Sequence, residues 1–92
     1  MAKVTLKGFI LVPPSELDVI SNELATHIEL TKIERGCLVF EVTQDADNPF
    51  KFHVYEEFTS QQAFESHQAR VVASRWGSVT KNVERYYEFT SG

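Results

Sequence analysis

Hydrophobic residues in the first third of the chain switch from a two-residue spacing to a helical one. Residues 3–12 alternate between two faces, which predicts a strand that ends at Pro13-Pro14. From Leu17 to Thr31 the apolar positions recur three or four residues apart, which predicts a helix. Gly36 is the expected end of this helical region, since glycine favours helix C-termini.

The rest of the chain repeats both spacings. Residues 37–43 and 51–58 alternate, and the polar turn at 45–49 joins them into a predicted β-hairpin. A second helix is expected to follow and to run through Val71, and a short helical segment after it leads to a last strand at 84–90.

Individual positions set further expectations. Ser15 is the predicted N-cap of the first helix, and Thr59 or Ser60 that of the second, because these side chains accept hydrogen bonds from free backbone N–H groups. Strict alternation places Leu38 on the same strand face as Phe40.

The element order is strand, helix, strand, strand, helix, strand. It predicts an α+β fold of the ferredoxin-like, split βαβ type, with both helices on one face of a four-stranded antiparallel sheet. The other sheet face is expected to carry Phe9, Leu11, Val39, Tyr55 and either Tyr87 and Phe89 or their neighbours, because alternation leaves the inward face of the last strand open. This apolar surface is too large to leave in water. We therefore expect a homodimer formed by sheet-to-sheet packing.

Composition and charge narrow the function classes. The 92 residues are read as one domain, residues 1–92, and a formal net charge of -4 with scattered basic residues argues against nucleic-acid binding. The single cysteine, Cys37, allows no internal disulfide and suits a reducing compartment, and no leader segment is recognised, so a cytoplasmic location is expected. Apolar runs fall far short of the ~20 residues of a membrane helix, so no membrane association is expected.

Polar side chains interrupt the apolar positions at three places. His67 falls at the centre of the apolar stripe of the second helix, His27 at the edge of the first, and Glu56 within the apolar face of the strand at 51–58. Burying such groups without partners costs about 2 kcal/mol or more. The sequence therefore predicts that His27, Glu56 and His67 meet in one layer and form the candidate catalytic group.

Several uses of this group stay open. A partly buried histidine is the usual general base at neutral pH, and a nearby carboxylate can fix its tautomer. The alternative is a structural hydrogen bond between Glu56 and a histidine. A metal site of these three residues is compatible in ligand type, but no local ligand spacing supports it, so none is predicted.

Aromatic side chains are expected to form the walls around the group and to exclude water. Trp76 and Arg75 follow the second helix and are placed at the rim. The expected substrate-binding residues are Phe40, Phe52, Phe58, Phe64, Trp76 and Arg75.

Residues 34–42, the turn at 45–49, Glu56-Glu57-Phe58, and Ala63-Phe64 followed by His67 resemble the antibiotic-biosynthesis monooxygenase-like (ABM) domain family, over about residues 4–90. The resemblance implies a dimeric α+β barrel with a pocket between sheet and helices, and points to the quinol-monooxygenase-like branch, whose members need no metal, flavin or haem. Glu56, Phe58, Phe64 and His67 match the family pattern, and many relatives also hold a histidine at the position of His27. Phe58 stands where tryptophan is common, and the asparagine and tryptophan pair associated with haem breakdown has no clear counterpart.

Three functions follow as hypotheses. The first is a cofactor-independent monooxygenase that oxidises a small aromatic or quinol, with molecular oxygen as co-substrate and His67 or His27 as the base. The second is an isomerase of a small phosphorylated metabolite, which requires Arg70 and Arg75 to point inward. The third is a non-catalytic small-ligand-binding stress protein.

Overall fold

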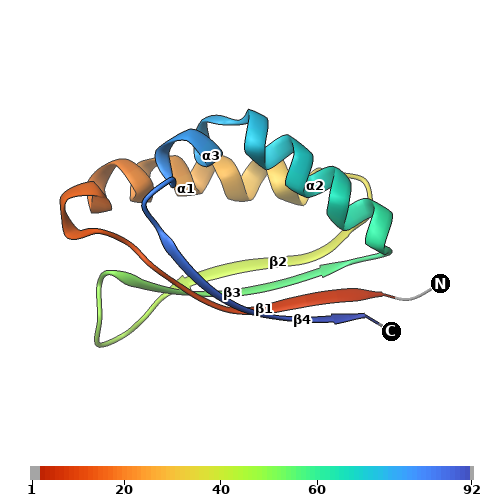
Figure 1. Cartoon of the computed structure of the whole chain (residues 1–92), viewed down its shortest axis with the longest axis horizontal. Coiled ribbons are helices and arrows are strands. Elements are labelled where there is room, and N and C mark those ends of the chain that lie inside the picture. Colours follow the sequence, from red (N-terminus) through yellow and green to blue (C-terminus); the bar gives the residue numbers. More distant parts are fainter. Residues whose placement is uncertain (1–2, 92) are drawn as a thin grey trace.

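Helices cover one face of a four-stranded antiparallel sheet and leave the other face bare (Figure 1). This architecture comes from a computed structural model that describes residues 3–91. The elements are β1 (Val4–Leu11), η1 (Pro14–Glu16), α1 (Leu17–Lys32), β2 (Cys37–Gln44), β3 (Lys51–Phe58), α2 (Gln61–Ala73), α3 (Arg75–Val79) and β4 (Glu84–Ser91).

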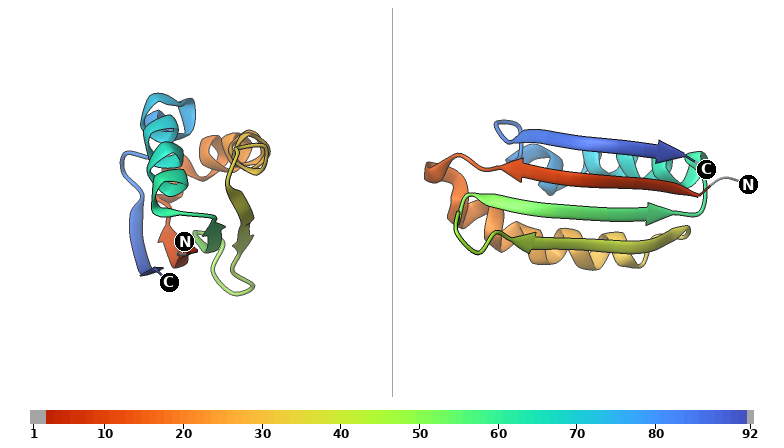
Figure 2. Two further views of the ribbon diagram at one scale, coloured as in Figure 1. Left: turned by 90° about the vertical axis from the view of Figure 1, so that its right-hand side faces the viewer. Right: turned by 90° about the horizontal axis from the view of Figure 1, so that it is seen from below.

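The strands lie in the order β2-β3-β1-β4, and each neighbouring pair is antiparallel. The ferredoxin-like arrangement predicted from the element order is confirmed. Figure 2 shows α1 over the β2–β3 half of the sheet, with α2 and α3 over the β1–β4 half. The two long helices therefore lie side by side above the central strands, where side chains from both can meet.

The core lies between the helices and the sheet, on the strand faces that alternation selected. The buried apolar residues of β1 and β3 are Val4, Leu6, Ile10, Phe52, Val54 and Phe58. Glu56 lies in this same row and is buried with them. None of the helices within residues 3–91 has the length and hydropathy needed to cross a membrane. The cytoplasmic location stays a prediction.

Three local predictions can be compared with the structure. Ser15 does not cap α1, because the chain after Pro13 first forms the 3₁₀ turn η1 and α1 begins at Leu17 without a side-chain cap. Ser60 caps α2 as expected, since its Oγ accepts a hydrogen bond of 3.1 Å from the N–H of Ala63. Leu38 is 52% exposed, so the prediction that it shares the face of Phe40 is wrong.

A β-bulge explains the exposure of Leu38. Cys37 is opposite Phe58, yet Val39 is opposite Glu57, so β2 contains one more residue than β3 at this point. The extra residue shifts the alternation and turns Leu38 outward. Phe40, just beyond the bulge, returns to the helix-facing layer opposite Glu56.

Gly36 fixes the junction between α1 and β2 against the start of α2. Its φ of 94° lies in the left-handed region that favours glycine, and a Cβ there would come within 2.7 Å of the Ala63 Cβ. Its carbonyl accepts a 2.8 Å hydrogen bond from the N–H of Thr59. This contact brings Glu34, two residues earlier, next to α2.

Candidate functional site

Two small cavities lie between the sheet and the helices, and His27, Glu56 and Tyr87 line both of them. The larger, of about 80 Å³, is completed by Leu6, His67, Gln68, Val71 and Arg85. The smaller, of about 30 Å³, is completed by Ile10, Phe40, Val42, Val54 and Trp76. Because they share these walls, we treat the two cavities as one space and call it the chamber.

His67 is brought to the chamber by the buried side of α2 and is 4% exposed. Its Nδ1 lies 3.0 Å from Oε2 of Glu34. Its Nε2 lies on the side of Glu56, 3.9 Å from Oε1 of that residue. A proton on Nδ1 donated to Glu34 leaves Nε2 as an unprotonated acceptor facing the chamber.

Opposing effects act on the pKa of His67. Burial lowers it and is the largest effect, while the hydrogen bond from Nδ1 to Glu34 and the charge of Glu34 raise it. The net pKa is below the usual value, so the imidazole is neutral at pH 7 and able to accept a proton.

Glu34 is itself held by a chain of hydrogen bonds that joins α1 to α2. Arg70 donates from Nε to Glu34 and from its second guanidinium nitrogen to Oγ1 of Thr31, at 2.9 Å in the latter case. Thr31 donates in turn to the carbonyl oxygen of His27, at 2.8 Å. The orientation of His67 and the backbone position of His27 therefore depend on one connected network.

His27 lies across the chamber from His67, with ring centroids 6.0 Å apart. Its ring stacks on Trp76 at 4.6 Å and meets Phe40 edge-on at 5.3 Å. Burial is the main reason that its pKa falls to about 3, with further lowering by the charges of His67 and the arginines. Within residues 3–91 its buried Nδ1 has no hydrogen-bond partner.

Glu56 occupies the floor of the chamber, on β3, and is 6% exposed. Burial, followed by the charge of Glu34, raises its pKa to about 7. The 3.9 Å separation from His67 is within reach of an ion pair but too long for a hydrogen bond, and Oε1 has no hydrogen-bond partner among the described residues. Glu56 and His27 thus present free polar atoms to the same enclosed space.

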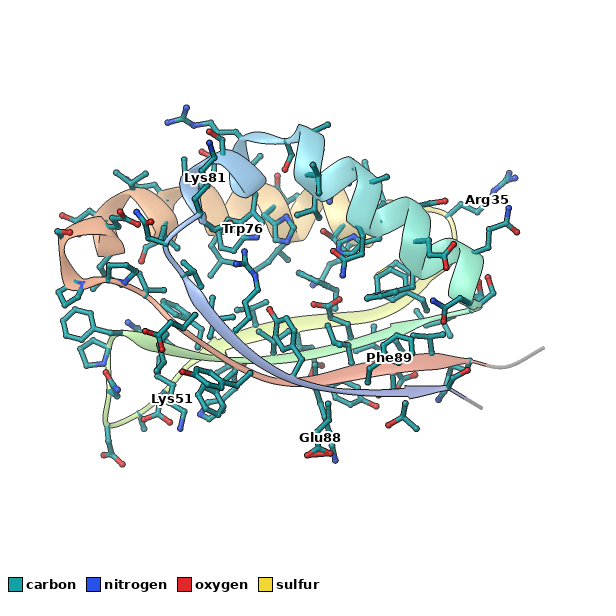
Figure 3. The ribbon with its side chains drawn as sticks, in the orientation of Figure 1. Arg35, Lys51, Trp76, Lys81, Glu88 and Phe89 are labelled. Carbon is teal, nitrogen blue, oxygen red and sulfur yellow. The ribbon has the colours of Figure 1, made fainter. Side chains whose placement is uncertain are left out.

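The structure brings together the three side chains predicted as the catalytic group. Figure 3 shows Trp76 between the helices and the sheet, and Phe40 joins it as a chamber wall. Phe58 packs below His67 at 5.0 Å between ring centroids, and Phe64 packs on Phe58 at 5.6 Å. These two phenylalanines support His67 and do not line the chamber.

Two predicted substrate-binding residues lie apart from this group. Phe52 belongs to the apolar core around Val12 and Ile20. Arg75 is exposed, and its Nε donates to Glu23 at 3.0 Å. Neither lines the chamber, because β3 carries Phe52 toward its far end and α3 directs Arg75 to the outer side of α1.

Four residues with polar side chains at the chamber were missing from the predicted site: Glu34, Gln68, Arg85 and Tyr87. Glu34 lies two residues beyond the end of α1, so helical spacing did not single it out. Tyr87 and Arg85 share a face of β4, and their register opposite Gly8 and Ile10 shows that this face points to the helices. Alternation alone left that choice of face open.

No group of three or more histidine, cysteine, aspartate or glutamate side chains in residues 3–91 has the arrangement needed to hold an ion.

Solved structures share this fold at low sequence identity. A candidate antibiotic biosynthesis monooxygenase from Nitrosomonas europaea has a TM-score of 0.78 at 17% identity, with 99% of this chain and 88% of that chain covered. A conserved protein of unknown function from Bacteroides thetaiotaomicron has a TM-score of 0.82 at 13% identity, covering 99% and 98%. A candidate antibiotic biosynthesis monooxygenase from the same Bacteroides species has a TM-score of 0.79 at 22% identity, covering 99% and 87%.

No curated protein matches the chain. The model of the antibiotic biosynthesis monooxygenase family matches residues 4–76, which include β1 to β3, both long helices, and all three of His27, Glu56 and His67. The chain therefore belongs to the antibiotic biosynthesis monooxygenase (ABM) family.

Proposed function

We propose that the chain is a cofactor-independent monooxygenase that oxidises a small aromatic or quinol with molecular oxygen. The observation that carries this proposal is the chamber itself, into which two neutral histidines and a buried carboxyl group project. In such a reaction a quinol and one dioxygen molecule give a hydroxyquinone and one water. The substrate supplies the electrons, so the protein has only to bind, deprotonate and shield it.

His67 is the preferred base. Its Nδ1 is held by Glu34 at 3.0 Å, so the lone pair of Nε2 faces the chamber, where a phenolic hydroxyl can reach it. Proton transfer to Nε2 leaves a phenolate, whose electrons can pass to dioxygen. The positive charge gained by His67 is stabilised by Glu34.

The free atoms of His27 and Glu56 suit the polar end of such a substrate. Glu56, with a pKa of about 7, is able to donate or accept a hydrogen bond near neutral pH. His27 stays neutral because its pKa is about 3, so its unpaired Nδ1 adds no charge to compete with the phenolate.

The size of the chamber limits how the substrate sits. Its larger part, about 80 Å³, is smaller than the ~150 Å³ cavity that holds benzene in another protein. We infer that the reactive hydroxyl enters the enclosed part while the ring stays in the mouth between α2 and β4. Exposed side chains that can move border this mouth, among them Gln68, Arg85 and the 38% exposed Tyr87.

The direct test measures oxygen uptake by the purified chain with hydroquinone. His67→Ala is expected to lower turnover by about 10²- to 10⁴-fold, the usual contribution of a general base. Ser66→Ala, the neighbouring exposed position of α2, is the matched control and should keep wild-type turnover. Equal turnover in the His67 variant and the wild type would contradict the proposal.

The geometry favours this function over an isomerase of a phosphorylated metabolite. Such an enzyme needs inward-pointing cations, whereas Arg70 is engaged by Glu34 and Arg75 by Glu23. Neither arginine lines the chamber, so Arg85 is left as the one arginine among the described residues that does, whereas a phosphate group calls for several such donors. A purely ligand-storing protein would also use the free atoms of His27 and Glu56, and the oxygen measurement separates it from an oxygenase.

We also propose that the active form is a homodimer that packs the bare faces of two sheets together. Phe9 and Tyr86 stack on that face with centroids 4.9 Å apart, and both border a hollow of about 650 Å³. Tyr86 is 48% exposed in the single chain. Covering these aromatic rings would supply the apolar contact that a stable interface requires.

A further inference from the structure

We propose that the chamber selects substrates that carry an acidic group opposite their reactive hydroxyl, and that Arg85 recognises this group. The inference rests on the proposed function only for the phenolic end of the ligand. It names a specificity-determining residue at the mouth, where the far side of the ring would lie.

Arg85 differs from the other arginines of the elements around the chamber. Arg70 pairs with Glu34 and Arg75 with Glu23, whereas Arg85 has no carboxylate within 4 Å among the described residues. Its second guanidinium nitrogen donates to Oγ1 of Thr80 at 2.9 Å. A neutral hydroxyl positions the guanidinium without cancelling its charge.

Among the described residues that line the chamber, Arg85 carries the permanent positive charge. His27 is neutral, with a pKa of about 3, and burial raises the pKa of Tyr87 to about 12. Glu56 is the acid that lines the space, and at a pKa of about 7 it carries only part of a charge at neutral pH. An anion at the mouth would therefore meet an uncompensated guanidinium.

Neighbouring carboxylates do not point at Arg85. Glu84 lies on the other face of β4, where it accepts a hydrogen bond from Tyr86. Glu34 lies behind His67 and is already paired with Arg70. The first terminal nitrogen of Arg85 donates to the carbonyl oxygens of Thr80 and Val83, at 3.4 Å each, whereas its Nε–H has no hydrogen-bond partner among the described residues. A planar guanidinium can bind a carboxylate through Nε–H and a second, parallel N–H group.

Trp76 offers a direct way to measure binding. It is the single tryptophan of the chain, lines the chamber and stacks on His27, so a bound ring should change its fluorescence. The probes are 4-hydroxybenzoate and its neutral analogue 4-hydroxybenzamide. We expect the wild type to bind the acid about tenfold more tightly, the size of one charge-assisted hydrogen bond.

Substitutions assign the preference to one residue. Arg85→Gln should bind both probes equally, and its retained binding of the amide shows that the chamber is still folded. Arg85→Lys keeps the charge but not the planar fork and should keep part of the preference. Arg35→Gln, at an exposed position at the far end of the molecule (Figure 3), removes the same charge and should behave as the wild type.

Each outcome decides between the two proposals. Equal affinity of the wild type for acid and amide, a preference that survives Arg85→Gln, or a wild type that binds neither probe would overturn the role of Arg85. Oxygen uptake with hydroquinone but no preference for the acid would overturn this inference alone. A preference for the acid without oxygen uptake would overturn only the monooxygenase reaction.

Discussion

Glu56 places a carboxyl group in a strand face whose other members, Phe52, Val54 and Phe58, are buried and apolar. Its charged form is disfavoured there, since burial removes water and the nearest charge, that of Glu34, has the same sign. An acid whose folded pKa is raised binds its proton more tightly in the folded chain than in the unfolded one. The stability of the fold is thereby linked to pH through one residue.

Glu56→Gln should remove this contribution to the pH dependence of stability, because glutamine does not ionise. Between an unfolded pKa near 4.5 and a folded pKa of about 7, ionisation of Glu56 lowers the free energy of unfolding as pH rises. The full span corresponds to about 3 kcal/mol. Urea denaturation at pH 5 and pH 8 should therefore show the variant gaining about 2 kcal/mol relative to the wild type at the higher pH.

The opposite trend of His27 does not affect that comparison. Its lowered pKa costs stability as pH falls from 6.5 toward 3, equally in the wild type and in Glu56→Gln. Glu41→Gln removes an exposed carboxylate of β2 and serves as the control. A difference between Glu56→Gln and the wild type that is the same at both pH values would show that Glu56 is not held in its neutral form.

Glu34 shows what residue-level patterns leave out. The pattern placed His27, Glu56 and His67 in one layer, because buried faces follow from hydrophobic spacing. Yet the closest partner of His67 is Glu34, which lies beyond the end of α1 in the loop before β2. A loop side chain is positioned by backbone geometry rather than by periodicity, so its role appears only once Gly36 has set the course of the chain.

At the scale of elements, the buried face of α1 differs from the one that its apolar spacing predicts. Counting Leu17 and Leu24 in the stripe puts His27 at its edge. In the structure both leucines are only partly buried, and the fully buried line runs through Ile20, His27 and Thr31. His27 stacks on Trp76 of α3, and the sequence of α1 alone does not predict this contact.

The inward faces of β2 and β4 likewise depend on the strands with which they pair. The bulge after Cys37 is a difference in length between two paired strands, so it cannot be read from β2 by itself. The face of β4 depends on its register with β1, where Tyr87 pairs with Gly8. Element type and order could be predicted from local spacing, whereas register required the assembled sheet.

The junction at Gly36 yields a prediction for element packing. Gly36→Ala must hold a left-handed backbone and also place a methyl group 2.7 Å from the Ala63 Cβ. We expect a loss of about 1–3 kcal/mol in the free energy of unfolding. Because α2 would shift relative to Glu34, oxygen uptake should fall more than the loss of folded protein accounts for.

Arg35→Ala is the control for this junction, since it changes the exposed neighbour without altering the backbone requirement. Chemical denaturation and activity measured on the same samples separate the two effects. Wild-type stability in Gly36→Ala would mean that the loop can relax around the methyl group.

At the scale of the whole molecule, the helices account for one face of the sheet only. Figure 2 shows that no helix covers the other face. On that face Phe9 stacks with Tyr86, and the ammonium of Lys51 lies 4.4 Å from the Phe9 ring centroid. A chain of 92 residues has little core to spare, so covering this face would add stability that the helices do not provide.

Phe9→Glu tests whether a second copy covers it. In the proposed dimer the carboxylate would be buried near the centre of the interface and would replace the aromatic stack with Tyr86. Even with the Lys51 ammonium close to it, removing the carboxylate from water is expected to cost several kcal/mol. Light scattering after size exclusion should give twice the 10.5 kDa of the chain for the wild type, and the single-chain mass for the variant. Val72→Glu adds the same charge at an 81% exposed site on α2 and should stay dimeric. A wild type that remains monomeric at high concentration would contradict the proposed dimer. The proposals about the chamber would stand, because one chain supplies all of its walls.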